Sequence, residues 1–404
     1  MSVPLDRLYH YLGDCVNHDL IIYRWAPHGS RKLEDLSPLT KDLEQDWYNR
    51  PMMLFHDQEP LFYNMYTTDQ LRNRAKQIFG ADCHNKKFNC MLKDTVLDYV
   101  ASQYLRAVMY CGNCYDKAIL VHSEVHSSQV ELFAQKNFVP VYYWSHAVIS
   151  LDWFRYAAHD LTLAFNPKKI QQDFLIYNRA WSGTREYRLC FVEQLLTVGL
   201  QQHCNISFSP EDGEHYSTHQ FTNPDFQIVN HNLHNKLELN THNSTDSADY
   251  CSEDYATAGI EVVLETLFDD RRWHLTEKTL RPIACGKPFI LMATQGSLKY
   301  LQTYGFETFD GLIDESYDTI VDSRPRLDAI IQEMKRIAEL DADAKQVLYT
   351  KLHEIAQRNK QRFFNGLFDQ VIEEYKINLN QAMIVMQQHC TNKHYTVIQE
   401  LLQN

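Results

Sequence analysis

The strongest constraint on the fold is an alternation of strand-like and helix-like segments that begins near the start of the chain and later restarts. The first half alternates short apolar runs with segments of helical spacing, at 4–13, 19–25, 52–55, 95–109, 118–121, 127–135 and 139–143. Strands that alternate with helices argue for a parallel sheet with helices on both faces. The sequence therefore predicts an α/β fold.

The alternation restarts near Asn166 and Pro167, where we place a domain boundary. Further segments of both kinds follow at 173–177, 187–200, 226–229, 259–264, 288–292 and 297–304. Ser297 is the expected N-cap of the last helix, and Gly305 lies just past its end. The second half is thus a second α/β unit of the same kind as the first.

Beyond residue 324 the apolar spacing is wholly helical. One apolar stripe there consists of Leu327, Ile330, Ile331, Met334 and Ile337. These patterns predict three parts: an α/β domain over 1–165, a second α/β domain over 166–324, and a helical region over 325–404.

Composition excludes several classes of protein. Asp and Glu number 52 against 39 Lys and Arg, which gives a net charge of −13 and disfavours a non-specific nucleic-acid binder. No run of 18 apolar residues is present, so we expect no membrane insertion. The start, Met1–Arg7, lacks the pattern of a secretory signal, and the ten cysteines are scattered, which predicts reduced thiols and a cytoplasmic location.

The segment 273–318 carries the most specific chemical signal. Thr276 is a good N-cap for a helix that ends at Gly286, and a strand follows. A helix start offers free N–H groups and a positive dipole end, which suit a diphosphate. Glu277 and Lys278 add a carboxylate for ribose hydroxyls and a positive charge. Pro282 predicts a kink or an early break in this helix.

This segment resembles the nucleotide-sugar-binding segment of GT-B glycosyltransferases. It looks most like the α-1,3-fucosyltransferase family, and the fuller pattern over about 45 residues resembles uncharacterised glycosyltransferase-like proteins of tailed phages. The resemblance implies two Rossmann-like domains that face a cleft, with Thr276, Glu277 and Lys278 as donor ligands. It also implies a host-cytoplasmic location if the chain is phage-encoded. Leu280–Pro282 departs from the family's more regular helix. The alternative for Thr276–Lys278 is an ordinary helix cap with a solvated charge pair.

A second basic segment follows the strand at 173–177. The patch 177–185 loosely resembles the start of the fucosyltransferase donor domain, where basic residues approach the phosphates. Arg179, Arg185 and Arg188 lie between a strand end and a helix start, where ligands of α/β sheets collect. We expect Arg179 and Arg185 to bind the donor, with Arg185 preferred because it stands at the helix entry. A solvated loop is the alternative.

The general base is expected in the first half of the chain. An inverting transferase of this type needs a carboxylate from the N-terminal domain, and Asp57 and Glu59 follow directly after the apolar run 52–55. A turn with exposed charges is the alternative for these two residues. His122, Glu124 and His146 also follow predicted strands and are the next candidates.

Metal binding is not expected. Cys111 and Cys114 form one CxxC, with Cys83, His84 and Cys90 upstream, but a single CxxC is a weak signal for zinc. We interpret the acidic stretch 314–318 as a loop beside the donor site. A metal or redox protein centred on the CxxC is the least favoured of the functions considered.

The leading hypothesis is an inverting glycosyltransferase with no tightly bound cofactor and a nucleotide-sugar as co-substrate. The acceptor hydroxyl is left open among a hydroxylated DNA base, a carbohydrate and a protein. A DNA acceptor would require local basic residues, and one candidate cluster consists of Arg72, Arg74, Lys76, Lys86 and Lys87. The alternative is a non-catalytic binding protein on a degenerate GT-B scaffold.

Overall fold

The structure is a computed structural model that describes residues 21–24, 52–56, 60–61, 117–135, 138–156, 166–236 and 248–389. The predicted helices at 4–13 and 95–109 lie outside these residues. The chain divides into two compact units. Unit 1 contains His146–Gln370, and the described residues of unit 2 fall within Val3–Ser145 and Val371–Asn404.

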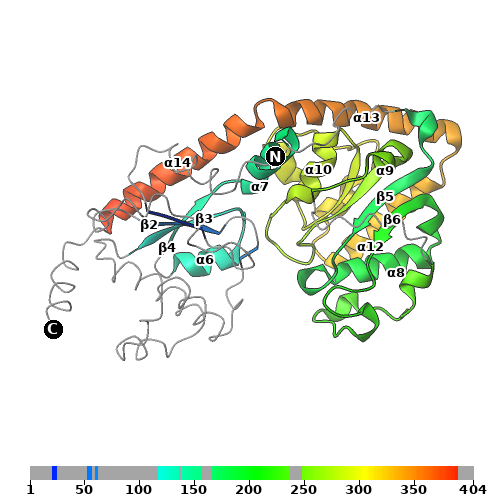
Figure 1. Ribbon diagram of the computed structural model, residues 1–404, viewed down its shortest axis with the longest axis horizontal. Coiled ribbons are helices and arrows are strands. Elements are labelled where there is room, and N and C mark those ends of the chain that lie inside the picture. Colours follow the sequence, from blue (N-terminus) through cyan, green and yellow to red (C-terminus); the bar gives the residue numbers. More distant parts are fainter. Residues whose placement is uncertain are drawn as a thin grey trace. The chain divides into compact units, whose positions relative to one another are not determined.

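Unit 2 contains a parallel four-stranded sheet in which chain order and spatial order agree. Its strands are β1 (Ile21–Arg24), β2 (Met52–His56), β3 (Ala118–His122) and β4 (Phe138–Tyr142), paired in that order. Helix α6 (Ser128–Ala134) packs on β4 through Phe133 and Phe138, whose rings meet edge to face. From Val371 on, α14 (Leu367–Gln388) contacts the same sheet, where Tyr375 lies against Met53 and Tyr143 (Figure 1).

Unit 1 is built on a second parallel sheet with a different strand order. Its strands are β5 (Gln172–Asn178), β6 (Cys204–Phe208), β7 (Ala258–Leu264) and β8 (Phe289–Met292), and they lie in the order β6-β5-β7-β8. β7 is buried along its whole length and β5 along nearly all of it, as expected for the centre of a sheet covered on both faces. The mixed α/β fold with parallel sheets predicted from the sequence is confirmed.

Helices cover both faces of the unit 1 sheet. Their bounds are α7 (Ser145–Tyr156), α8 (Tyr187–Thr197), α9 (Ser252–Thr257), α10 (Glu277–Cys285), α11 (Ser297–Thr303), α12 (Ser323–Ala338) and α13 (Ala342–Phe364). Figure 1 shows α10 and α13 on one face and α8 and α12 on the other, and these helices pack on each other in the same two pairs. None of the helices in the described ranges is long and apolar enough to cross a membrane.

Short 3-10 helices lie in the connections of unit 1. They span Pro167–Lys169, Gly183–Arg185, Leu200–His203, Tyr216–Thr218, Pro224–Phe226, Leu233–Lys236 and Glu315–Thr319. Within the predicted helical region beyond residue 324, the described residues up to 389 contain most of α12 and all of α13 and α14. The compact units group these helices differently from the predicted ranges, because α12 and α13 belong to unit 1 whereas most of α14 belongs to unit 2.

Two local predictions for unit 1 are wrong, the strand at 226–229 and the N-cap at Ser297, and one strand was not predicted. The run 226–229 is not a strand: Asn223 caps a 3-10 helix at Pro224–Phe226, and Val229 is 85% exposed. The strand that the sequence did not predict is β6, in which buried and partly exposed residues alternate. Ser297 is also not the N-cap of α11, because Gly296 takes that place at φ 80°.

Helix α10 is anchored on β7 by a buried ion pair. Arg281 donates to the carboxylate of Glu261, and the hydroxyl of Tyr255 donates to the same carboxylate. Arg281 Nε also lies 3.2 Å from the Tyr255 hydroxyl, so the charged groups have polar partners despite their burial. The cluster fixes the distance and rotation of α10 relative to the sheet.

Helix α13 approaches β7 closely because Gly259 has no side chain. A Cβ at residue 259 would lie 2.7 Å from the ring of Tyr349 and 3.0 Å from the carbonyl oxygen of Asp173. The Tyr349 hydroxyl donates to the Asp173 carboxylate, and Lys345 Nζ lies 2.8 Å from it. These contacts hold the ring in place, so it has little freedom to move aside.

We expect Gly259→Ala to lower the free energy of unfolding by about 1–3 kcal/mol, the usual cost of overpacking a core. Urea denaturation of the parent and the variant measures the change. The control is the same substitution in a Tyr349→Ala background, where the penalty should be smaller because the ring is gone. Equal penalties in both backgrounds would show that the Tyr349 ring is not the cause.

Candidate functional site

The candidate site lies at the edge of the unit 1 sheet where its parallel strands end. The strand order reverses between β5 and β7, since β6 lies on one side of β5 and β7 on the other. Ligands of open α/β sheets bind beyond the carboxyl ends of strands at such a reversal. Arg179 and Arg185 follow β5, and Thr276–Lys278 follow β7. The fold therefore brings the two predicted donor segments to one edge.

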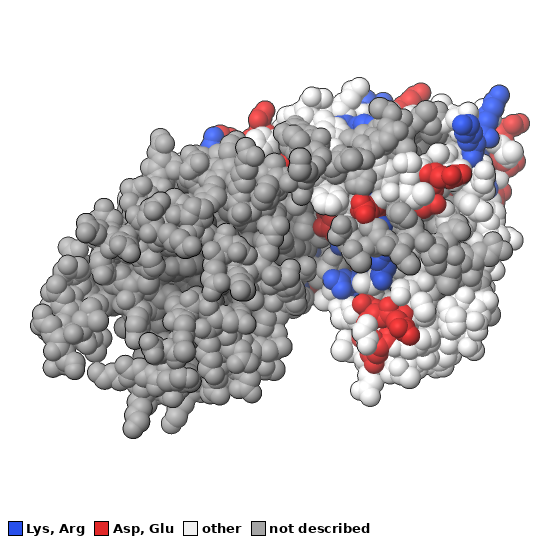
Figure 2. Space-filling model, viewed as in Figure 1, with Lys and Arg blue, Asp and Glu red and all other residues white. Residues whose placement is uncertain are grey.

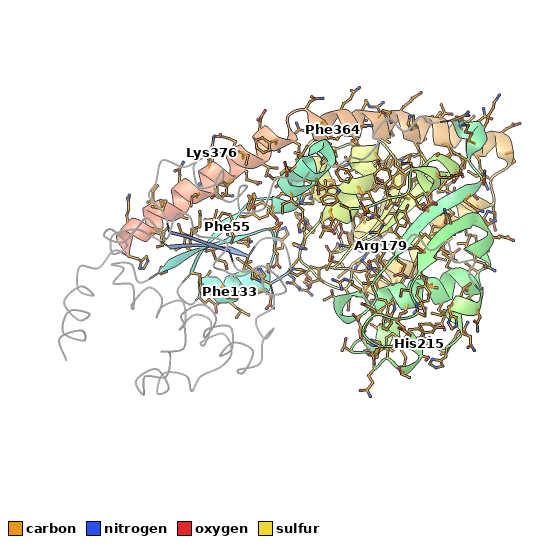
Figure 3. The ribbon with its side chains drawn as sticks, in the orientation of Figure 1. Phe55, Phe133, Arg179, His215, Phe364 and Lys376 are labelled. Carbon is orange, nitrogen blue, oxygen red and sulfur yellow. The ribbon has the colours of Figure 1, made fainter. Side chains whose placement is uncertain are left out.

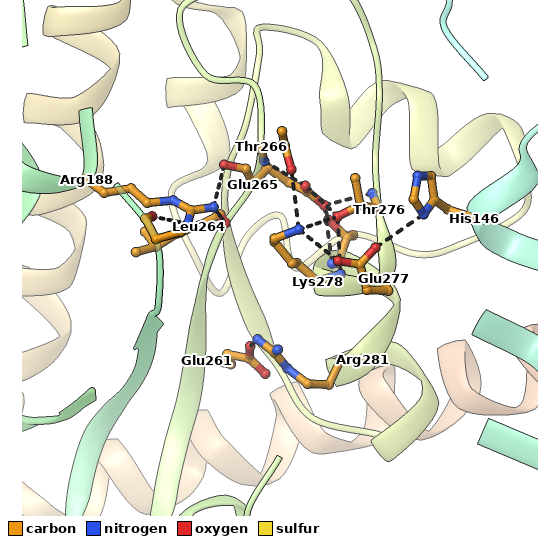
Figure 4. Close-up of polar contacts among 12 residues, drawn as sticks. His146, Arg188, Glu261, Leu264, Glu265, Thr266, Thr276, Glu277, Lys278 and Arg281 are labelled. Atoms are coloured by element: carbon orange, nitrogen blue, oxygen red, sulfur yellow. Dashed lines mark hydrogen bonds and ion pairs between the residues drawn. The ribbon is translucent and has the colours of Figure 1, made fainter. Parts of the chain in front are cut away.

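Arg188 joins the exits of the two central strands. This buried guanidinium donates to the carbonyl oxygens of Ala180, Leu264 and Glu265 (Figure 4). The hydroxyl of Tyr187 donates to the Glu265 carbonyl as well, at 2.6 Å. The guanidinium of Arg188 thus donates to backbone carbonyl groups and holds the loops after β5 and β7 together.

The start and the end of α10 are as the sequence predicts. The hydroxyl of Thr276, in extended conformation, accepts from the amide of Lys278 at 3.3 Å. Gly286 ends the helix at φ 70°, in the left-handed region that favours glycine. The early break predicted at Pro282 does not occur, since α10 continues through Pro282 to Cys285.

A buried carboxylate occupies the amino end of α10. Glu265 Oε1 accepts from the amides of Thr276 and Thr279 at 2.9 and 3.3 Å and from the Thr279 hydroxyl at 2.5 Å. Its Oε2 accepts from the Thr276 hydroxyl and the Thr266 amide at 2.9 and 3.0 Å. The helix-end amides of Thr276 and Thr279 are therefore not free for a diphosphate. The amides of Thr276, Lys278 and Thr279 at this helix start thus have acceptors within the chain.

Lys278 is the cation nearest to this helix end. Its Nζ lies 2.8 Å from Glu277 Oε1 and 3.3 Å from the hydroxyls of Thr266 and Thr276. Thr184 Oγ1 donates to the Thr266 carbonyl at 2.9 Å, so the loop that carries Arg185 lies beside the loop that contacts Lys278. The two hydroxyl contacts are long for hydrogen bonds, and a phosphate oxygen would be a stronger acceptor.

Glu277 is held from both sides. Lys278 contacts Oε1, and Nδ1 of His146, which lies on α7, is 3.2 Å from Oε2 (Figure 4). Burial alone would raise the pKa of Glu277, but the charge of Lys278 and the hydrogen bond with His146 hold that pKa well below its usual range. Burial would lower the pKa of His146, but its hydrogen bond with Glu277 and the Glu277 charge raise it. The contact thus favours the charged carboxylate of Glu277 and the protonated form of His146.

Arg179, labelled in Figure 3, directly follows β5, and its guanidinium lies over the ring of Tyr177. Its guanidinium carbon is 5.1 Å from the centre of the Tyr177 ring, and Nη2 donates to the Asp249 carbonyl at 2.7 Å. The guanidinium of Arg281 is 4.8 Å from the same ring centre. Burial, together with the charge of Arg281, lowers the pKa of Arg179. The charge of Arg281 is compensated by the Glu261 carboxylate, which leaves Arg179 as the cation of this pair that could contact an anion.

Arg185 ends the 3-10 helix Gly183–Arg185, where the sequence placed it at a helix entry. The amides of Trp181 and Ser182 before it donate to Asp212 Oδ2 at 2.9 and 2.7 Å. Burial would raise the pKa of Asp212, but the hydrogen bonds from Ser182 and Trp181 and the charge of Arg185 lower it. As at α10, a carboxylate of the chain occupies the backbone amides, and the residue Arg185 is partly exposed.

The surface around this part of unit 1 has mixed charge. Figure 2 shows a small group of Lys and Arg atoms flanked by Asp and Glu atoms on the visible face of the described residues. A continuous basic face, which phosphate-backbone binding requires, is not seen on that face. The predicted basic cluster at 72–87 lies outside the described residues.

The predicted base, Asp57 or Glu59, lies outside the described residues. Of the alternatives in unit 2, His122 accepts the Glu124 amide at Nδ1, at 3.3 Å, and burial lowers the pKa of His122 to about 3. The Glu124 carboxylate accepts from the Leu61 amide and the Ser127 hydroxyl. Glu124 thus acts as a structural acceptor, and His122 is a neutral donor through Nε2.

In the described part of the chain, no group of three or more His, Cys, Asp or Glu residues is placed to hold a metal ion. The acidic stretch 314–318 accepts backbone hydrogen bonds. The Asp314 carboxylate accepts from the amide of Ser316 at 3.0 Å, and the Glu315 carboxylate accepts from the amide of Phe309 at 2.8 Å. Cys111 and Cys114, with Cys83 and Cys90, lie outside the described residues.

Two carboxylates of the site, Asp212 and Glu265, were not predicted from the sequence. Glu265 had a signal, because it directly follows the apolar run 259–264 at a strand end, as the predicted Asp57 follows another. Asp212 had none, since it lies in the polar loop after the unpredicted strand β6. Their roles depend on backbone amides that are distant in sequence.

A histidine between two carboxylates fastens the loop after β6 to the loop after β5. His219 Nε2 lies 2.8 Å from Glu186 and Nδ1 lies 2.6 Å from Glu214. Glu186 also accepts from the amides of Thr222 and Asn223 at 2.7 and 2.9 Å. Since both ring nitrogens face carboxylate oxygens, both carry protons and His219 is an imidazolium.

Comparisons with known proteins identify no relative of this chain. A scan against protein-family models gives no match, and searches of curated proteins and of solved structures find none. What this chain does is therefore inferred from its own residues and contacts.

We expect the stability that His219 contributes to depend on pH. Burial lowers the pKa of His219, but the hydrogen bonds with Glu214 and Glu186 raise it above the unfolded value of about 6.5. Stabilisation is therefore complete below about pH 6.5 and is lost as pH rises through the raised pKa. Urea denaturation of the parent and His219→Gln across this range measures it.

The difference in unfolding free energy between parent and His219→Gln should shrink as pH rises. Glu214→Gln removes one of the two carboxylates and should move this decline to lower pH. A difference that stays constant from about pH 6 to about pH 9 would contradict the imidazolium assignment.

Proposed function

We propose that this chain is a glycosyltransferase that binds a nucleotide-sugar at the carboxyl edge of the unit 1 sheet and transfers its sugar to a hydroxyl acceptor. The GT-B arrangement, in which two α/β units face a cleft, is part of this proposal. The observation that carries it is the ionised Glu277 carboxylate, oriented by two cations beside a basic strand exit. The resemblance of the segment 273–318 to donor-binding segments supports it.

Glu277 supplies the acceptor groups that a ribose requires. A carboxylate has about four acceptor positions, and Lys278 and His146 each use one, on different oxygens. One position on each oxygen is thereby left for a vicinal diol, which donates two parallel hydrogen bonds. The low pKa of Glu277 keeps both oxygens available as acceptors at neutral pH.

The diphosphate is assigned to side chains. Lys278, in the first turn of α10, contacts Thr266, and the Thr184–Thr266 hydrogen bond brings the segment that carries Arg185 beside that loop. Fixed cations at the leaving diphosphate stabilise the charge that develops as the sugar departs. Asp57 or Glu59 remains the proposed base, the donor is proposed as a co-substrate, and the acceptor stays open among the classes considered.

One observation favours a second function, nucleotide binding without transfer. The backbone amides at both loop exits are occupied by Asp212 and Glu265. A site with these amides filled has fewer groups left to stabilise a leaving diphosphate. Donor hydrolysis by the parent chain separates the two functions, since a binding protein leaves the nucleotide-sugar intact.

We expect Lys278→Ala to weaken binding of a nucleoside diphosphate about tenfold or more and to leave binding of the free nucleoside unchanged. One hydrogen bond to a charged group contributes about 1.5–3 kcal/mol. Calorimetry with UDP, GDP, ADP and CDP and their nucleosides measures both. Lys351→Ala, an exposed lysine of α13, is the matched control. Equal diphosphate affinity in parent and Lys278→Ala would remove Lys278 from the site.

We expect Glu277→Gln to abolish a preference for ribonucleotides over 2′-deoxyribonucleotides. The amide offers one acceptor oxygen instead of two and places N–H donors toward Lys278 or His146. The ratio of the two dissociation constants, about tenfold in the parent, should approach one, a loss of about 1.4 kcal/mol. Glu354→Gln on the exposed face of α13 serves as control. A ratio near one in the parent itself would argue against ribose recognition by Glu277.

A further inference from the structure

The side chain of His146 lies deep in unit 1, against the start of α10. It is 5% exposed and comes from the first turn of α7. Its Nδ1 is 3.2 Å from Glu277 Oε2, and its ring meets the ring of His274 edge to face at 5.2 Å. An imidazole held in this way has little rotational freedom.

Lys278 cannot orient Glu277 by itself. Its ammonium is a point charge on a flexible stem, and it is shared among Glu277 and the hydroxyls of Thr266 and Thr276. A single contact on Oε1 leaves the carboxylate free to rotate about its own axis. The contact of His146 with Oε2 fixes that rotation and hence the direction of the remaining lone pairs.

Opposing effects act on the pKa of His146, and their net result is to raise it. Glu277 and Glu265 favour its charged form, whereas Lys278 and burial oppose it. Among the described residues, His274 is a further titratable group against its ring. The Glu265 carboxylate accepts five hydrogen bonds at the helix end, so the contact with Glu277 is the direct one.

We propose that His146 is a positioning residue, which turns the Glu277 carboxylate so that both oxygens face the two hydroxyls of a ribose. The inference rests on the proposed function and adds a residue that sequence reasoning considered as a base. Because the Nδ1–H of His146 donates to the Glu277 carboxylate, this nitrogen has no lone pair to accept a proton. It acts on the ligand through Glu277.

The test compares His146→Ala and His146→Asn with the parent by calorimetry, using UDP, GDP, ADP and CDP and their 2′-deoxy counterparts. Alanine removes the contact, whereas the asparagine amide places a donor at about the position of Nδ1. We expect the parent to prefer ribonucleotides over 2′-deoxyribonucleotides about tenfold. This preference should be lost in His146→Ala and largely kept in His146→Asn. His203→Asn, which changes another histidine–carboxylate pair at the opposite edge of the sheet, should leave the preference unchanged.

A pH series adds a readout that a merely structural role would not move. The ribose preference of the parent should decline as pH rises above about 6.5 and through the raised pKa of His146. In His146→Asn it should be independent of pH. If His146→Ala does not fold, the pH dependence of the parent compared with that of His146→Asn tests the positioning role.

The outcomes separate the two proposals. A His146→Ala variant that folds and keeps the full preference, or a parent whose preference does not change with pH, overturns the positioning role and leaves the proposed function standing. A parent that binds none of the nucleotides overturns both. Loss in alanine, retention in asparagine and the pH-dependent decline together support the role of His146.

Discussion

The arrangement of the candidate site depends on one buried carboxylate. Glu265 follows β7 directly and satisfies two amides and a hydroxyl at the start of α10. Its own carbonyl is bonded by Tyr187 and Arg188 of α8. The same residue therefore fixes the helix that carries Glu277 and Lys278 and the loop that follows β5. Each donor left without an acceptor in such a place costs about 1–3 kcal/mol, which explains why a charged side chain is retained there.

Filling the helix end with a carboxylate changes what the site can recognise. A free helix start binds any anion through backbone amides and the helix dipole. Here the amides of Thr276, Lys278 and Thr279 have acceptors within the chain, so the proposed recognition depends more on side chains. Glu277 has Lys278 at one oxygen and His146 at the other, an arrangement that suits a pair of donors better than an anion.

Sequence reasoning succeeded where the signal is local. The cap at Thr276, the left-handed end at Gly286 and the fully buried strands β7 and β8 follow from propensity and from runs that are apolar apart from Glu261 in β7. It failed at β6, whose alternating pattern is short and polar, and at 226–229, where an apolar run is held by a local Asn cap instead of a sheet. Asp212 and His146 act on segments far along the chain, and no local pattern reports such a contact.

The histidines that follow strands of unit 2 bear on the choice of a general base. A base needs a free lone pair, and its pKa should lie near the working pH. At His122 the Nδ1 lone pair accepts the amide of Glu124, so the remaining nitrogen carries the proton and donates. His146, which follows β4 in the chain, belongs to unit 1 and is committed to Glu277. Neither histidine fits the role, and the proposal therefore stays with a carboxylate, Asp57 or Glu59, whose charged form is the one that accepts a proton.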